Sequence, residues 1–402
     1  MKKILFITQA VGGVETSLLL IFKFLSREQY ELHLICPPGT NLASAAASYG
    51  VRVHTVKIER NPHILRDLWS LIIIVRILKK GGYHLVHAQS AKGGLLARLA
   101  TQVVRVNKVI YSPRAFSYMS QRRLLYQVFL SLERLTARFT DVLIAASDSE
   151  KVRAISEVHY DKSRVVVVPN SVDPDVFFSI QRADEPPGEK TVLTIGRLGY
   201  QKNPMMFLDL VECICAHRGD INFVMQGGGF LGHLENRVVQ RIQRSVILRT
   251  YCKLLPWSEN GSLRKIYEQC SVFVLTSLFE GMPNTILEAM MYGIPVVATD
   301  VDGSRDLVVH GVTGFLVSTA ETETMARHVS SLVDDRELWT KMSNAARLRI
   351  RQHYLAPVNI RRLEKIYDED RISNNVPSIS KDFQQEELAP DTGFHQIYCG
   401  KH

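Results

Sequence analysis

Two glutamates stand eight positions apart in the segment Glu280-Gly-Met-Pro-Asn-Thr-Ile-Leu-Glu288. The apolar run 270–276 before this segment predicts a buried strand, and the segment itself predicts the start of a helix, with Glu288 about one turn in. Free backbone N–H groups at a helix start favour a phosphate or another anion. Carboxylates on both sides of that start can accept hydrogen bonds from the hydroxyl groups of a polyol. The segment therefore predicts a site for a phosphorylated sugar, and the alternative is that both glutamates are ordinary surface acids.

Another pair of charged residues follows a predicted strand earlier in the chain. Arg197 and Lys202 stand five positions apart after the apolar run 191–195. A guanidinium fork and an ammonium beyond the end of a strand can hold the two phosphates of a diphosphate. The alternative is a pair of solvated bases, but the position after a strand favours a phosphate clamp.

Two glycine pairs stand where predicted strands end. Gly12 and Gly13 follow the run 4–8 and precede a helical pattern, and Gly227 and Gly228 follow the run 221–225. Glycine lets the backbone come close to a ligand at a helix start. A simple tight turn explains the first pair equally well. The second pair also fits the spacing of a dinucleotide-binding fingerprint, but it lies in mid-chain and lacks the acidic residue that such a site places after the next strand.

Length and composition limit the classes of protein to which this chain can belong. At 402 residues the chain is too long for one ordinary core, so two domains are expected. A hydrophobic content of 46% and a charged content of 22% are those of a soluble globular protein. The six cysteines have no metal-ligand spacing, which is typical of a cytosolic protein. The most apolar run, 68–78, is too short to span a bilayer, and residues 1–8 are interpreted as a strand rather than a signal peptide.

Charge is unevenly distributed along the chain. Residues 1–170 carry 24 Lys and Arg against 11 Asp and Glu, and the remaining residues carry 25 against 29. Between Arg76 and Arg138 there are twelve basic residues and one acid, Glu133. Such a patch implies an anionic partner, which is a nucleic acid, a membrane surface or a charged substrate. This stretch lacks the aromatic-rich pattern of a nucleic-acid stacking surface, so no nucleic acid is expected.

Apolar strand patterns alternate with amphipathic helix patterns in both halves of the chain. Strands are expected at 4–8, 31–36, 52–56, 85–88, 108–112, 141–145 and 164–168, and, after a polar Pro-rich linker at 182–190, at 191–195, 221–225, 247–251, 272–275, 296–299 and 315–317. This alternation predicts an α/β fold with two parallel sheets and a ligand crevice at their carboxyl ends. We expect an N-terminal domain at 1–175, a C-terminal domain at 176–355, a helix packing across the domains at 356–370 and a disordered tail at 371–402.

Taken together, these motifs resemble glycosyltransferase family 4 over residues 3–355. The resemblance rests on the Glu-x7-Glu segment, on both glycine turns, and on the segments Val168-Pro-Asn-Ser-Val-Asp173, Gly196-Arg-Leu-x3-Lys-Asn-Pro204 and Gly311-Val-Thr-Gly-Phe-Leu-Val317. It implies the GT-B fold, in which two Rossmann-like doubly wound domains face each other across the active site. It also implies a retaining hexosyltransferase that moves a sugar from a nucleoside diphosphate to an acceptor, without a protein nucleophile, a cofactor or a divalent metal.

The resemblance implies a role for each motif. Arg197 and Lys202 neutralise the departing diphosphate, and Glu288 holds the ribose. Glu280 holds the transferred sugar together with Gly281, Met282, Pro283, Asn284 and Thr285. The backbone comes close to the diphosphate, the acceptor or the nucleobase at Gly12, Gly13, Gly227 and Gly228. The strings Asp173-Pro-Asp175 and Asp300-Val-Asp302 are interpreted as turn acids rather than as a metal site.

Two positions depart from the family pattern. Family members carry a histidine in a pattern like Tyr-Thr-x-His-Gly-Phe, where this chain has Tyr111-Ser-Pro-Arg114-Ala-Phe116. Arginine cannot act as a general base, but it can steady a leaving phosphate or a charged acceptor. His87 is kept where the family has a histidine, and Gln89 replaces a second one. Arg114 and His87 are therefore candidate catalytic residues. The alternative for His87 is a core histidine whose ring nitrogens are satisfied by hydrogen bonds.

The expected partners follow from the resemblance and the charge pattern. The donor is a nucleotide sugar, with uridine as the expected base, and the acceptor is a polyprenyl-linked sugar or a glycan in lipopolysaccharide or capsule synthesis. Helices of the basic N-terminal domain, such as 122–138, mix basic and apolar residues and are expected to bind the inner, anionic face of the plasma membrane from the cytoplasm. The alternatives are a nucleotide-sugar epimerase of the same fold and a nucleotide-sugar-binding protein that has lost catalysis.

Overall fold

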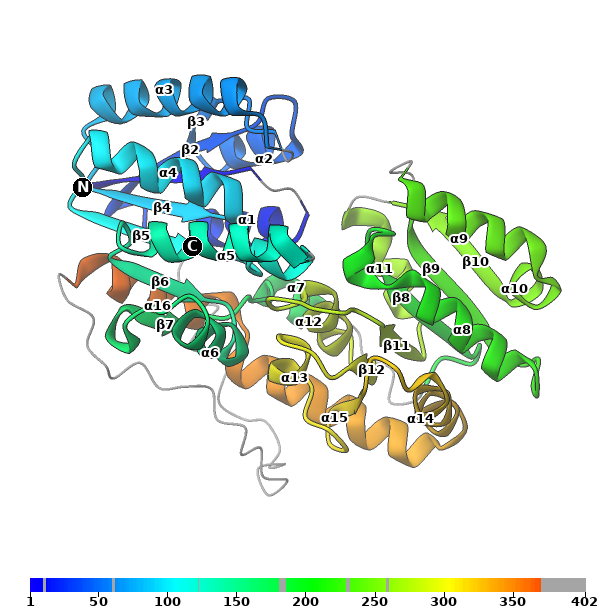
Figure 1. The fold of residues 1–402 in the computed structure, drawn as a ribbon. Helices are drawn as coiled ribbons and strands as arrows, with labels where there is room; N and C mark the ends of the chain where they lie inside the picture. Colours follow the sequence, from blue (N-terminus) through cyan, green and yellow to red (C-terminus); the bar gives the residue numbers. More distant parts are fainter. Residues whose placement is uncertain are drawn as a thin grey trace.

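The structure, a computed structural model, describes residues 1–9, 12–59, 62–121, 123–180, 186–228, 232–257 and 260–369, without the side chains of 260–262. The expected tail at 371–402 and residues 182–185 of the expected linker lie outside these ranges. The described strands form two sheets, one in each half of the chain, as Figure 1 shows. All pairs of named strands are parallel.

The first sheet has seven strands in the order β3-β2-β1-β4-β5-β6-β7. They are β1 (Lys2–Thr8), β2 (Tyr30–Cys36), β3 (Arg52–Thr55), β4 (Leu85–Gln89), β5 (Lys108–Ser112), β6 (Val142–Ala145) and β7 (Val165–Val167). Because successive side chains of a strand alternate, Ile4 and Phe6 of β1 enter one core while Leu5 and Ile7 enter another. Both faces of the sheet are therefore buried, as is usual for parallel sheets.

Helices cover both faces of this sheet. One face is covered by α1 (Gly13–Phe24), α2 (Asn41–Ser48) and α16 (Ala356–Asp368). The other face is covered by α3 (Ile64–Gly81), α4 (Ala91–Val103), α5 (Arg123–Ala137) and α6 (Asp148–Ser156). The 3-10 helices η1 (Ser117–Ser120) and η2 (Lys162–Arg164) lie in the connections. The predicted alternation of strands and helices is confirmed.

The second sheet has six strands in the order β10-β9-β8-β11-β12-β13. They are β8 (Thr191–Ile195), β9 (Asn222–Gly228), β10 (Cys252–Pro256), β11 (Val272–Leu275), β12 (Val296–Thr299) and β13 (Gly314–Val317). One face packs against α8 (Pro204–Cys215), α9 (His233–Arg244), α10 (Val246–Tyr251) and α14 (Thr322–Asp334), and the other against α11 (Asn260–Glu268), α12 (Asn284–Met291) and α15 (Arg336–His353). The shorter helices are α7 (Pro174–Ser179), η3 (Tyr200–Lys202) and α13 (Ser304–Leu307).

The predicted strand at 247–251 is wrong, because this run is the short helix α10. The hydroxyl of Ser245 accepts a hydrogen bond from the N–H of Leu248 at 3.4 Å and so caps the helix start. Leu248 is fully buried in the core beside the second sheet. The strand follows directly, as β10. A short apolar run fits a strand or a buried helix equally well by periodicity, and here the cap decides for the helix.

The end of the described chain returns to the first half. Figure 1 shows α15 beneath the second sheet and α16 under the first. At this return, Val172 and Tyr354 share a backbone hydrogen bond of 2.8 Å. The ammonium of Lys2 pairs with Asp368 of α16 at 2.9 Å. The expected helix at 356–370 therefore packs on the first sheet, and its chain crosses from one half to the other just before it.

The parallel strands decide where a site can form. Their carboxyl ends lie at one edge of each sheet, so the loops that follow β1, β5, β8 and β11 gather between the halves. Among the described residues, no helix combines the length and the apolar character that crossing a membrane requires.

Candidate functional site

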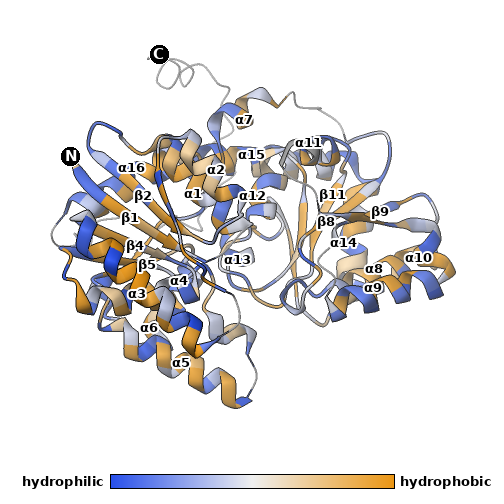
Figure 2. Cartoon of the chain, turned by 90° about the horizontal axis from the view of Figure 1, so that it is seen from above, coloured by the Kyte–Doolittle hydropathy of each residue, from blue (hydrophilic) through white to orange (hydrophobic). Residues whose placement is uncertain are grey.

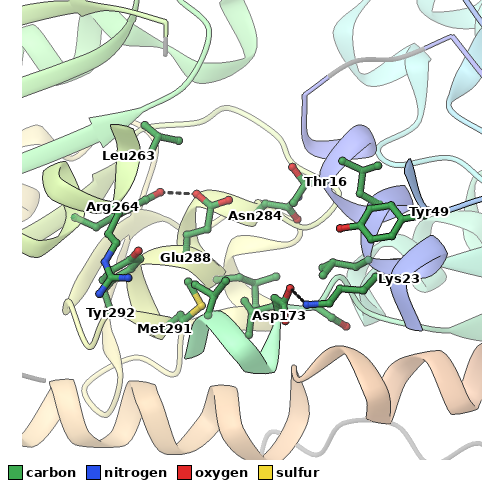
Figure 3. A pocket seen from close by; sticks show the side chains of 17 residues that line it. Thr16, Lys23, Tyr49, Asp173, Leu263, Arg264, Asn284, Glu288, Met291 and Tyr292 are labelled. Atoms are coloured by element: carbon green, nitrogen blue, oxygen red, sulfur yellow. Dashed lines mark hydrogen bonds and ion pairs between the residues drawn. The ribbon is translucent and has the colours of Figure 1, made fainter. Parts of the chain in front are cut away.

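A cavity of about 290 Å³ lies between the two halves. Its walls come from α1 in the first half and from α11 and α12 in the second. Figure 3 shows Thr16, Lys23 and Tyr49 on one side and Arg264 and Glu288 on the other. The start of α12 lies at this cavity, as the sequence predicted for the Glu-x7-Glu segment.

The carboxylate of Glu280 collects hydrogen bonds from three side chains. Its Oε1 accepts from the ammonium of Lys202 at 2.6 Å and from the hydroxyl of Ser277 at 2.7 Å. Its Oε2 accepts from the amide of Gln201 at 3.1 Å. The Glu280 side chain is only 7% exposed and that of Lys202 is 22% exposed. The structure therefore joins two residues that the sequence assigned to different motifs, the phosphate clamp and the sugar contact.

Lys202 is positioned by the loop that carries it. The hydroxyl of Thr276, at the end of β11, donates to the backbone carbonyls of Lys202 and Asn203 at 3.0 Å each. A side chain at Gly196 would lie 3.1 Å from the Lys202 side chain, so the loop packs closely around the lysine stem. Arg197 belongs to the same loop and is exposed.

The glycines of the second half shape this loop. Gly227 has a φ of +147°, and a Cβ there would stand 1.9 Å from the carbonyl oxygen of Gly196. Only glycine fits so close an approach of two backbones. The carbonyl of Gly228 accepts from the N–H of Trp257 at 2.6 Å. The glycine turn therefore presses against the loop of Arg197 and Lys202.

Glu288 is held by a residue that the sequence did not single out. The hydroxyl of Tyr267 in α11 donates to Glu288 Oε2 at 2.7 Å. Burial raises the pKa of Glu288 to about 7, against the hydrogen bond from Tyr267 and the positive charge of Lys202, which both lower it. A carboxyl poised near neutrality beside the cavity can change its charge when a ligand binds.

Asn170 connects the first half to the start of α12. Its side-chain amide donates to the carbonyl of Met282 at 2.9 Å and to Oδ1 of Asn284 at 2.7 Å. Asn284 in turn donates to the carbonyl of Gly13 in α1 at 3.0 Å. The predicted residues Gly13, Met282 and Asn284 are thus brought together across the two halves.

Arg114 lies beside Asn170, where the two halves meet. Its Nε donates to Oε1 of Gln89 at 3.0 Å, and a terminal nitrogen donates to Oδ1 of Asn170. Both acceptors are neutral amide oxygens. Burial lowers the pKa of Arg114, although Glu150 raises it. The residue has a φ of 59°, and a Cβ at Gly281 would stand 2.6 Å from the N of Ala115, so this loop touches the Glu280 turn.

His87 lies in the core of the first half and is 1% exposed. Its ring bonds to the hydroxyl of Tyr367 at 2.7 Å and to that of Ser112 at 2.9 Å. Burial, with the charge of Arg114, lowers the pKa of His87 to about 3, so the ring is neutral. These contacts fit the alternative of a hydrogen-bonded core histidine. His87 does not line the cavity between the halves, but it lines a smaller pocket of about 30 Å³ together with Arg114 and Asn170.

The remaining predicted residues lie around the same junction. Gly12 caps α1 with a φ of 80°, and Pro283 caps α12. Thr285 lies in the first turn of α12, and its hydroxyl is buried without a hydrogen-bond partner among the described residues. Gln201 and Ser277, which hold Glu280, were missed by the sequence reasoning, and their only signal was proximity to Lys202 and Glu280.

The two acid pairs interpreted as turn acids are engaged with cations. Lys23 pairs with Asp173 at 2.7 Å and with Asp175 at 2.6 Å. Asp300 pairs with Arg305 at 2.9 Å, and Asp302 pairs with Arg153 at 2.6 Å. Within the described residues, no group of three or more His, Cys, Asp or Glu side chains is arranged to hold a metal ion.

Sequence comparisons place this chain among known enzymes. A family model for glycosyl transferases group 1 matches residues 175–349, and one for Glycosyltransferase Family 4 matches residues 11–176. The UDP-Gal:alpha-D-GlcNAc-diphosphoundecaprenol alpha-1,3-galactosyltransferase of Escherichia coli is 30% identical over 371 residues, which cover 89% of this chain and 93% of that protein. The capsular polysaccharide biosynthesis glycosyltransferase CapM of Staphylococcus aureus is 21% identical over 363 residues, covering 86% and 92%.

Solved structures share the fold. Anabaena HepE in complex with UDP and glucose superposes with a TM-score of 0.76 at 20% identity, covering 91% of this chain and 99% of that one. The apo form of the lipopolysaccharide outer core galactosyltransferase WaaB superposes with a TM-score of 0.68 at 20% identity, covering 90% and 99%. These likenesses confirm the expected GT-B architecture.

Proposed function

The chain belongs to glycosyltransferase family 4, and we propose that it moves a sugar from a UDP-sugar to a lipid-linked sugar diphosphate during synthesis of a bacterial cell-surface polysaccharide. The Escherichia coli relative is named for a UDP-Gal donor and a diphosphoundecaprenol-linked acceptor. The observation that best supports a sugar-nucleotide site is the contact of Lys202 with Glu280 at 2.6 Å beside the start of α12.

The proposed diphosphate site combines side-chain and backbone charge. A lysine ammonium has three N–H donors, so Lys202 can bond to Glu280 and to phosphate oxygens together. Arg197, exposed on the same loop, adds a guanidinium fork. The backbone amides at the start of α12 favour negative charge in the same place. The carbonyl of Gly13, which accepts a hydrogen bond from the side chain of Asn284 at 3.0 Å, borders this site from the first half.

The proposed sugar contacts use the two carboxylates. An ionised carboxylate has about four acceptor positions, and the three bonds already made to Glu280 leave room for one sugar hydroxyl. Glu288 lines the cavity one turn further along α12, where it is proposed to accept hydroxyl groups of the ribose. The carboxylate of Glu280 is held by its three neighbours, whereas the carboxyl group of Glu288 can change its charge when the donor binds.

In the proposed reaction, the acceptor hydroxyl attacks the anomeric carbon on the face from which UDP departs, so the configuration is retained. The bond between the anomeric carbon and the β-phosphate oxygen breaks, and its electron pair stays on that oxygen. The same oxygen takes the proton of the hydroxyl group. Lys202 and Arg197 stabilise the negative charge as it develops. This scheme needs no protein nucleophile and no divalent metal.

Arg114 is proposed to bind a phosphate oxygen of the donor or the acceptor. Among the described residues, its hydrogen bonds go to neutral amide oxygens, so its charge is not cancelled by a carboxylate at hydrogen-bond distance. A guanidinium of this kind is well suited to a phosphate. The histidine that the family usually places here lacks the permanent charge.

A binding and turnover experiment tests the proposal. Thermal shift with UDP-galactose, UDP-glucose, UDP-N-acetylglucosamine and GDP-mannose should show stabilisation by a uridine nucleotide sugar. The donor that binds is then incubated with a chromophore-tagged N-acetylglucosamine diphospholipid, and a disaccharide product is expected. Stabilisation by GDP-mannose alone would contradict the uridine assignment, and stabilisation without any product would favour a protein that binds without catalysis.

The metal-free scheme has its own test. Transfer measured in excess EDTA should equal transfer in buffer alone, because the diphosphate charge is neutralised by Lys202, Arg197 and backbone amides. Loss of activity in EDTA and its recovery with manganese would contradict this scheme. That result would favour a metal site at Asp173-Pro-Asp175 or at Asp300-Val-Asp302.

A further inference from the structure

Helix α4 begins at the switch point of the first sheet. The chain leaves β1 toward α1 on one face of the sheet and leaves β4 toward α4 on the other, and β1 and β4 are neighbours. Figure 2 shows α1 and α4 on opposite sides of these two strands. In open parallel sheets, ligands bind outside the carboxyl ends of the strands at such a point. The start of α4 therefore lies where the fold favours a ligand.

Ser90 stands directly before α4 but does not cap it. A serine at this position usually accepts a hydrogen bond from an N–H of the first helical turn. Ser90 instead has a φ of 64° and makes no side-chain cap. The residue is 7% exposed, and its hydroxyl is buried without a hydrogen-bond partner among the described residues. A buried hydroxyl without a partner is destabilising, so this one is suited to bond to a ligand.

The first turn of α4 adds donors beside this hydroxyl. The first N–H groups of an α-helix have no partner within the helix and favour an anion. Gly93 lets this turn pack directly on the end of β1, because a Cβ there would stand only 3.1 Å from the backbone N of Gln9. The hydroxyl of Ser90 and the amides of the turn thus offer several donors at one helix start, as a phosphate requires.

Two cations accompany this helix start. The ammonium of Lys92, in the first turn, pairs with the carboxylate of Asp67 at 2.6 Å, so its charge is offset. The guanidinium of Arg114 donates to Gln89, the residue directly before Ser90, at 3.0 Å. In the described chain, the hydrogen bonds of this guanidinium go to amide oxygens. Arg114 therefore brings to the start of α4 a positive charge that no hydrogen-bonded carboxylate offsets.

We propose that the start of α4 is a phosphate subsite for the acceptor, separate from the site of the donor diphosphate. The hydroxyl of Ser90, the first amides of α4 and the guanidinium of Arg114 bind the diphosphate that joins the acceptor sugar to its lipid. This inference rests on the proposed function and deepens it, because it assigns Arg114 to the acceptor rather than to the donor. The donor diphosphate keeps its own proposed site in the second half, at Lys202 and the start of α12.

Steady-state kinetics with two acceptors tests the subsite. One acceptor is N-acetylglucosamine joined through a diphosphate to a short lipid, and the other is the neutral alkyl glycoside of the same sugar. Ser90→Ala should raise KM for the diphosphate acceptor by about tenfold, because a hydrogen bond to a charged group is lost. It should leave kcat, KM for the donor and KM for the alkyl glycoside unchanged. Equal changes with both acceptors, or no change with either, would overturn the proposal.

Ser44→Ala is the matched control in the same half of the chain. Ser44 is exposed on α2, and its hydroxyl donates to the carbonyl of Asn41 in its own helix at 3.0 Å. This variant should behave like the parent protein with both acceptors.

Stability separates a ligand contact from a structural role. The hydroxyl of Ser90 has no partner to lose among the described residues, so Ser90→Ala should unfold in urea with at least the free energy of the parent protein. A clearly less stable variant would show that the hydroxyl supports the fold, and would overturn the proposal.

Binding separates this proposal from the proposed function. In calorimetric titration with inorganic pyrophosphate, at saturating UDP, the dissociation constant should be about tenfold higher for Ser90→Ala than for the parent. If the parent transfers no sugar to either acceptor but shows this difference, the proposed function fails and the phosphate subsite stands. No binding of pyrophosphate by the UDP-saturated parent would overturn the subsite. Inhibition by orthophosphate that persists at saturating diphosphate acceptor would overturn the assignment to the acceptor and indicate a site for free phosphate.

Discussion

Lys202 and Glu280 form the contact on which the donor site depends. Sequence reasoning assigned the lysine to a phosphate and the glutamate to a sugar, and the structure shows that each also positions the other at 2.6 Å. A carboxylate that is 7% exposed needs such partners, because a buried charge without hydrogen bonds is strongly destabilising. Positioning and binding therefore use the same side chains.

Lys202→Ala should lower kcat/KM for transfer by about a hundredfold or more, because one of the groups that stabilise the departing diphosphate is lost. Lys190→Ala is the matched control, since Lys190 pairs with Asp220 at 2.8 Å on the surface of the second half. The control should be as active as the parent, because exposed ion pairs contribute little to stability. Initial rates with the cognate donor measure the activity of both variants, and circular dichroism checks that both are folded. Near-normal turnover by Lys202→Ala would show that this lysine does not stabilise the diphosphate.

Glu288 makes the stability of the ligand-free protein depend on pH. Folding raises its pKa from 4.5 to about 7, so the folded state holds this proton more tightly than the unfolded state does. Its favourable contribution is complete below pH 4.5 and is lost as the pH rises toward 7. Glu288→Gln, which has no proton to lose, should show a smaller decrease in the free energy of unfolding over that range. Urea unfolding at a series of pH values measures this, and identical slopes for both proteins would contradict it.

At the level of elements, the site depends on loops that two glycines bring together. The turn after β9 presses on the loop after β8, because Gly227 leaves no room for a side chain against Gly196. The sequence marked Gly227 as a ligand contact, and the structure adds a packing role that a single sequence does not reveal.

Gly227→Ala should displace the loop of Arg197 and Lys202, since the new Cβ would stand 1.9 Å from a backbone oxygen. We expect donor affinity to fall by about tenfold or more, with a lower melting temperature. Gly199→Ala is the control in the same loop, because its Cβ would meet no atom closer than 3.9 Å. Calorimetric titration with UDP compares the two variants, and equal dissociation constants would show that the glycine turn does not shape the clamp.

Much of the element order could be predicted from the sequence. Parallel strands buried on both faces read as apolar runs, and turn residues mark where they end, so β8, β11 and β12 lie where the apolar runs placed them. The run at 247–251 failed because its length and composition fit both a strand and a helix, and the deciding contact is the cap at Ser245. Tyr267, which holds Glu288, depends on tertiary packing and left no local signal, whereas the only signal for Gln201 was that it precedes Lys202.

For the whole molecule, the connection between the halves is part of the site. Asn170 bonds to Met282 and Asn284 of the second half, and Ser17 of α1 donates to Asn170 at 3.2 Å.

Asn170→Ala should lower the free energy of unfolding by about 1–3 kcal/mol, because buried polar groups lose their partners. It should also weaken UDP binding, since the start of α12 is no longer held. Asn236→Ala, at an exposed position on α9, is the control. Unchanged stability and binding in Asn170→Ala would mean that the halves are held by other contacts.

We propose that this cleft transfers a sugar from a UDP-sugar with retention of configuration. The most direct measurement is the NMR anomeric coupling of the new linkage, after incubation of the full chain with its UDP-sugar and an N-acetylglucosamine diphospholipid. We predict an α-linked disaccharide from the α-configured donor, and no product from Lys202→Ala. A β-linked disaccharide, or an epimerised nucleotide sugar with the acceptor unchanged, would contradict retaining sugar transfer by this protein.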